Sequence, residues 1–173
     1  MPQGHVQPAN AVLVAGTPIV EELEVKTATN MYPGRFVIKD TNDWDIKIAG
    51  AGALNVLGIL DVEPGELRAT IYGAGDQARV LRGAGCVVVA SLASGQSVAK
   101  GAELVVAANG ELTAATTISA TIPSGTVAVT SSSAQPAATM AGSRAPGGTV
   151  VAQAAETVDA SAGALPIMVY LRI

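Results

Sequence analysis

From residue 31 onward, the chain consists of short apolar runs that end at glycine, proline or asparagine. Several runs alternate apolar and polar residues, which is the period-two pattern of a half-buried β-strand. We therefore predict an all-β fold. The expected strands are RFVIKD (35–40), DIKIAG (45–50), NVLGILDV (55–62), RATIYG (68–73), ARVLRG (78–83), CVVVASL (86–92), ELVVAA (103–108), and two closing strands within GTVVAQAAETVD (148–159) and ALPIMVYLRI (164–173).

The stretch SVAKGAELVVAANGELTAA (97–115) contains the clearest turn. Asn109-Gly110 between two strand-like runs predicts a hairpin, because both residues accept a positive φ. Lys100 in the same stretch resembles the modified lysine of biotinyl and lipoyl carrier domains, but here the hairpin tip carries no lysine. We expect this stretch to form a hairpin and to carry no catalytic or cofactor-bearing residue.

Residues 1–30 precede the strand pattern. Pro2, Pro8 and Pro18 oppose a helix, while AVLVAG and IVEELEV are each able to form a short strand. We predict an extended N-terminal arm over 1–30, with a two-turn helix at 19–26 as the alternative. A single β domain is expected over 31–173, and its Ser-, Thr- and Ala-rich residues 116–149 are expected to form a long loop or insertion.

A weak internal repeat is visible. GRFVIKD, DIKIAGAG and NVLGILDV follow the same order of turns and strands as GQSVAKGAELVV, ANGELTAA and GTVVAQAAETVD. This order predicts two related β units within one barrel or roll.

Aromatic residues make up only 3% of the chain, so we expect a core of Ala, Val, Leu and Ile with Phe36 and Trp44 as its large members. A core this lean predicts an oligomer. The net charge of −4 and the absence of a basic cluster exclude nucleic acid as a partner. No apolar run is long enough for a membrane helix, and the N-terminus lacks the pattern of a signal peptide.

Candidate chemical motifs are weak. Cys86 is the single cysteine and His5 the single histidine, which excludes an internal disulfide and a Cys/His metal cluster. We expect Cys86 to be a small buried residue. Gly73-x-Gly75-x-x-Ala78 imitates a dinucleotide fingerprint, but no helix pattern follows it, so a turn between strands is expected.

The acidic clusters support no site either. Asp40, Asp43 and Asp45 lack the glycine and glutamate of a calcium loop and are expected to form a polar turn. We predict no catalytic residue, no cofactor and no metal, and we expect that the protein is not an enzyme.

The order of motifs resembles tailed-phage capsid decoration proteins, also called cement or head-stabilising proteins. The resemblance covers roughly residues 31–115 and 148–173, and turns and strand edges carry it. The matching segments are YPGRFVIKD (32–40), AGAGALNVLGILD (49–61), GDQARVLRGAGCVVVASLASGQSVAKGAELVV (75–106), NGELTAA (109–115), GTVVAQAAETVD (148–159) and PIMVYLRI (166–173).

The resemblance implies a small β-barrel or β-tulip-like domain, made in the host cytoplasm, that forms homotrimers on the outer capsid surface of the virion. Its partners would be the major capsid protein, whose neighbouring copies it cements, and itself. Two alternatives stay open: a head-fibre base or adhesin-like module with 116–149 as its binding tip, and a carrier domain modified on Lys100.

We expect the arm to contact the capsid or a neighbouring subunit, because strand-forming arms extend the sheets of adjacent subunits. The residues expected at this interface are Val12, Leu13, Val14, Ile19, Val20, Glu21, Glu22 and Glu24.

Overall fold

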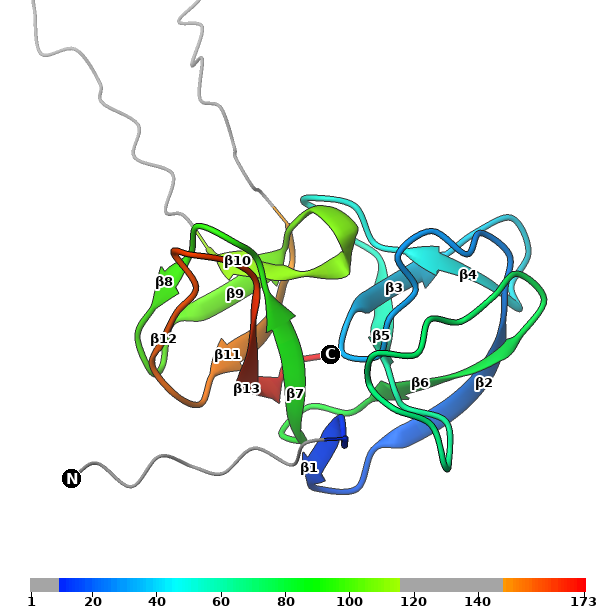
Figure 1. The fold of residues 1–173 in the computed structure, drawn as a ribbon, viewed down its shortest axis with the longest axis horizontal. Helices are drawn as coiled ribbons and strands as arrows, with labels where there is room; N and C mark the ends of the chain where they lie inside the picture. Colours follow the sequence, from blue (N-terminus) through cyan, green and yellow to red (C-terminus); the bar gives the residue numbers. More distant parts are fainter. Residues whose placement is uncertain (1–9, 116–147) are drawn as a thin grey trace, which may run out of the picture.

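The computed structural model describes residues 10–115 and 148–173 of the chain (Figure 1). These residues form strands β1 to β13 and one short 3-10 turn, η1 (Ala108–Gly110), and the described residues contain no α-helix. The predicted all-β fold class is confirmed. The predicted loop over 116–149 lies outside the described residues, except for its last two positions.

Five strands close into the first barrel, on the right of Figure 1. Around the barrel their order is β2-β4-β3-β5-β6. Only the β2–β4 pair is parallel. The strands are β2 (Ile19–Val25), β3 (Phe36–Lys39), β4 (Asp45–Ile48), β5 (Val56–Leu60) and β6 (Gln77–Arg82).

The second sheet has the strand order β1-β7-β10-β9-β11-β13, and an additional pairing of β7 with β13 closes it into a ring with β1 outside. A separate two-stranded sheet joins β8 (Ser97–Val98) to β12 (Val158–Asp159). The strands of the six-stranded sheet are β1 (Leu13–Ala15), β7 (Val87–Leu92), β9 (Glu103–Val106), β10 (Leu112–Ala114), β11 (Val150–Ala154) and β13 (Leu165–Leu171).

The two closed sheets repeat one connectivity. In chain order, β2 to β6 correspond to β7, β9, β10, β11 and β13, and each unit pairs its first and third strands in parallel and all others antiparallel. A positive-φ glycine opens the second strand of each unit, Gly34 (φ 83) before β3 and Gly101 (φ 89) before β9. The internal repeat seen in the sequence agrees with this arrangement, although the two units form two adjacent closed sheets rather than one.

The β9–β10 hairpin is confirmed. Leu112 pairs with Val106, and Asn109 (φ 58) and Gly110 (φ 68) both adopt positive φ at the turn, as the dipeptide predicts.

The predicted strand RATIYG is wrong. Residues 68–73 lie in the loop from β5 to β6 and form turns and irregular backbone. Both β5 and β6 already have two neighbours in the closed barrel, so no free edge is left for another strand. Tyr72 is buried as a single anchor, while Ile71 beside it is 44% exposed.

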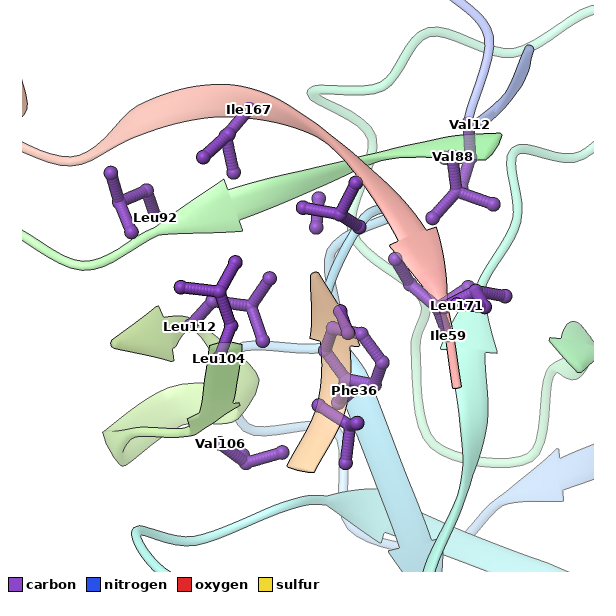
Figure 2. Packing of buried hydrophobic residues seen from close by; sticks show 14 of the residues in the cluster. Val12, Phe36, Ile59, Val88, Leu92, Leu104, Val106, Leu112, Ile167 and Leu171 are labelled. Atoms are coloured by element: carbon purple, nitrogen blue, oxygen red, sulfur yellow. The ribbon is translucent and has the colours of Figure 1, made fainter. Parts of the chain in front are cut away.

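One hydrophobic cluster joins the two closed sheets. Phe36 of β3 and Ile59 of β5, both fully buried, pack with Leu104, Leu112 and Leu171 of the second sheet (Figure 2). A second cluster, with Leu23, Val25 and Ile46 among its members, fills the first barrel itself. Phe36 is a core residue as predicted, but Trp44 is not, because it is 75% exposed.

Polar contacts reinforce the same junction. An Arg35 Nη2 to Glu111 Oε1 ion pair of 3.0 Å connects the start of β3 to the β9–β10 turn, and the Arg35 guanidinium lies 5.0 Å from the centre of the Tyr32 ring. The backbone N–H of Gly110 donates to the carbonyl of Ala49 at 2.8 Å. The two closed sheets are therefore held by a shared core and by directed bonds.

Candidate functional surface

The residues predicted for the N-terminal interface lie on two strands that pair within the chain, except for Val12, which directly precedes the first of them. β1 pairs antiparallel with β7, and β2 pairs with β4 and β6. Val12 is fully buried in the shared core, and Leu13 is partly buried against it. Val14, Ile19 and Val20 keep 38%, 57% and 42% of their surface exposed. Their role at an interface stays a prediction.

The three predicted glutamates of β2 differ in their surroundings. Glu21 accepts a hydrogen bond from the guanidinium of Arg82 on the neighbouring β6. Glu22 is exposed, and Glu24 is partly buried where β2 runs beside β4. Contact of these carboxylates with capsid also stays a prediction.

The turn between β3 and β4 holds Trp44 out in solvent. Lys39 is paired with Asp43, and Asp40 accepts hydrogen bonds from Lys47 Nζ and Thr27 Oγ1, both at 3.0 Å. The hydrogen bond from Lys47 lowers the pKa of the Asp40 carboxyl, and that from Lys39 lowers the pKa of Asp43. These pairs order the turn around an exposed indole, a side chain that is frequent at the centre of protein interfaces.

The acidic residues at this turn have partners within the protein. Asp45 is buried and accepts from Asn42 Nδ2 at 2.8 Å, while Asp40 and Asp43 are paired with lysines. Within residues 10–115 and 148–173, no group of three or more His, Cys, Asp or Glu residues is placed to hold a metal ion. The polar turn expected from the sequence is what these residues form.

The β5–β6 loop, residues 61–76, carries a second surface of interest. A hollow of about 130 Å³ lies in it, with Leu67 (56% exposed) and Ile71 (44% exposed) beside Pro33 and Tyr72. The acidic residues Glu63, Glu66 and Asp76 line the same hollow, and Thr70 completes it. The sequence analysis missed this surface, because it expected residues 68–73 to form a strand of the sheet, with their apolar side chains in the core.

The remaining motifs have structural roles. The backbone N–H of Gly73 donates to Asp76 Oδ2 at 2.6 Å, and strand β6 follows instead of the helix that a dinucleotide site needs. Cys86 is buried, as expected, and unpaired. Lys100 is exposed at a turn where its backbone N–H donates to Thr157 Oγ1 at 3.1 Å.

Across the part of the chain that the structure describes, we find no helix with the length and apolar character needed to span a membrane.

Comparison with known proteins gives a family. The chain matches the family model of the XM1 gp53 minor capsid protein over residues 2–142. Among solved structures, the head fiber gp8.5 N base of bacteriophage phi29 aligns with 11% sequence identity and a TM-score of 0.49, over 90% of this chain and 94% of that one. No curated protein sequence matches the chain. The expectation of a phage capsid-associated protein is confirmed: the chain belongs to the XM1 gp53 minor capsid protein family.

Proposed function

We propose that this minor capsid protein binds the outer face of the assembled icosahedral head as a homotrimer, cements neighbouring major capsid proteins there, and is not an enzyme. The family match supports a capsid-associated role. The binding mode is inferred from the surface described above.

The observation that carries the proposal is a well-ordered surface that leaves large apolar side chains in solvent. Trp44, the single tryptophan, is 75% exposed on a turn held by ion pairs. Leu54 is 63% exposed near the same turn, where Lys39 lines both adjoining hollows. Apolar groups held out by an ordered backbone lose little freedom on binding, which favours association with another protein.

The mechanism is stabilisation by mass action. A protein that binds only the assembled shell stabilises it by RT ln(1 + [L]/Kd) per site. Docking a trimer across several capsid subunits adds a link between neighbours at each occupied position. The major capsid protein and a second and third copy of this chain are the partners in this proposal.

The proposal is tested by light scattering followed by co-sedimentation with undecorated phage heads. A trimer that binds the heads saturably supports decoration, and Trp44→Ala is expected to weaken binding while leaving the circular dichroism spectrum unchanged. A monomer that stays in the supernatant contradicts the proposal. A mass increase on Lys100 in protein purified from infected cells would instead favour the carrier alternative.

A further inference from the structure

Hydrogen bonds of Tyr72 tie the β5–β6 loop to its own start and to the segment before β3. The hydroxyl of Tyr72 donates to the carbonyl of Asp61 at 2.7 Å, and the backbone N–H of Tyr72 donates to the carbonyl of Met31 at 3.0 Å. Near its middle, Thr70 Oγ1 donates to Glu66 Oε2 at 3.2 Å. A loop ordered in this way offers a formed surface to a partner.

The size of the hollow limits what it can receive. Its volume of about 130 Å³ is slightly below the roughly 150 Å³ of an engineered protein cavity that binds benzene. Leu67 and Ile71 form its exposed apolar side, so the occupant also has an apolar portion. One long side chain is small enough to enter a hollow of this volume.

The charge of the residues that line the hollow indicates which chemical group the entering side chain carries at its end. Glu63, Glu66 and Asp76 line it, and no lysine, arginine or histidine is among the described residues that do so. Arg68 lies within the same loop but is not among the residues that line the hollow. Three carboxylates around an apolar wall match a side chain with a methylene stem and a cationic head.

We propose that this hollow, which we call the acidic hollow, receives one lysine or arginine side chain of the major capsid protein. The stem packs on Leu67 and Ile71, and the cationic head meets the carboxylates of Glu63, Glu66 and Asp76. The inference rests on the proposed function and names the contact through which docking occurs. Nucleic acid is disfavoured as the occupant, since its phosphates would face three like charges.

Charge complementarity also favours the capsid protein over a second copy of this chain. The chain carries 14 acidic residues against 10 lysines and arginines, with a net charge of −4. A second copy of this chain offers fewer cationic than anionic side chains to these carboxylates, so we assign the occupant to the capsid protein. The second copy is therefore the competing occupant that the experiment separates.

The test compares the binding of variants to undecorated heads. Glu63→Lys/Glu66→Lys is expected to raise Kd about fivefold, because it removes two exposed ion pairs that each contribute up to about a factor of five, and charge reversal adds repulsion. Leu67→Ala is expected to raise Kd by about the same factor through lost apolar contact. Glu103→Lys, which makes the same type of Glu→Lys reversal once at an exposed position of β9, is the control and is expected to change Kd less than about twofold.

Added salt gives an independent readout. Wild-type binding is expected to weaken as NaCl rises, and the Glu63→Lys/Glu66→Lys variant is expected to lose most of this dependence. All variants are first checked for an unchanged urea midpoint, which is expected because the substituted residues are exposed.

The outcomes are distinguishable. If the wild-type protein does not bind heads, the proposed function fails. If the wild-type protein binds and the acidic-hollow variants bind equally well, only this inference is overturned. If the variants instead lose the trimer mass in light scattering, the hollow is a contact between copies of this chain, which also overturns the proposal.

Discussion

Phe36 is the residue whose removal tests the shared core most sharply. It is the single phenylalanine of the chain, is fully buried, and extends from β3 of the first barrel into the cluster that contains Leu104 and Leu112 of the second sheet. Replacing it with alanine leaves a cavity where the two closed sheets meet. A buried Phe→Ala change is expected to lower the free energy of unfolding by about 3–5 kcal/mol, a large part of the 5–15 kcal/mol of a typical domain.

The assay is urea unfolding followed by circular dichroism. With a slope of about 2 kcal/mol per molar urea, the expected loss moves the midpoint down by about 1.5–2.5 M. Leu54→Ala is the control, since it removes an apolar side chain that is 63% exposed and is expected to change stability by less than about 0.5 kcal/mol. A loss below about 1 kcal/mol for Phe36→Ala would refute the role of this ring in the shared core.

Two further predictions concern close packing and pH. Gly58→Ala would place a Cβ 2.4 Å from the carbonyl oxygen of Leu81 on the neighbouring strand, so it is expected to destabilise the protein by about 1–3 kcal/mol. Gly50→Ala, with no atom within 4 Å of the new Cβ, is the control, and equal midpoints for the two variants would contradict the packing of β5 against β6. Burial raises the pKa of Tyr72 from 10.0 to about 12, so the unfolded chain loses this proton first. Stability is then expected to fall by about 2–3 kcal/mol as pH rises from 10 to 12. In urea titrations between pH 10 and 12, Tyr72→Phe is expected to lose less stability than the wild type. An equal loss in the two proteins would contradict the raised pKa of Tyr72 as its cause.

Much of the strand pattern could be predicted from local residues. The strands predicted at 35–40, 45–50 and 78–83 follow turn residues, and their apolar side chains contribute to the hydrophobic core. The Asn109-Gly110 turn was predictable because few dipeptides accept positive φ at both positions. These strands and this turn are determined mainly by residues adjacent in the sequence, so local patterns are sufficient to predict them.

The features that were not predicted depend on residues far apart in the chain. Trp44 is apolar enough for a core, but pairing of Lys39 with Asp43 and of Lys47 with Asp40 fixes a turn that holds it outside. RATIYG has a strand-like composition, yet the closed barrel has no edge to pair with it.

The acidic hollow likewise arises only through distant contacts. It forms because Tyr72 anchors its loop to Met31, a contact between distant segments that no local pattern reports. The pairing of β2 with β6 within the first barrel is non-local in the same way.

The central claim, that this protein is a structural part on the outside of the phage head, is tested most directly by a cryo-electron microscopy difference map. Heads assembled with the protein are compared with heads assembled without it. We predict additional density on the outer face at three-fold and quasi-three-fold positions, with a two-lobed subunit that fits the two closed sheets. Absence of additional density, or density on the inner face of the shell, would contradict the account.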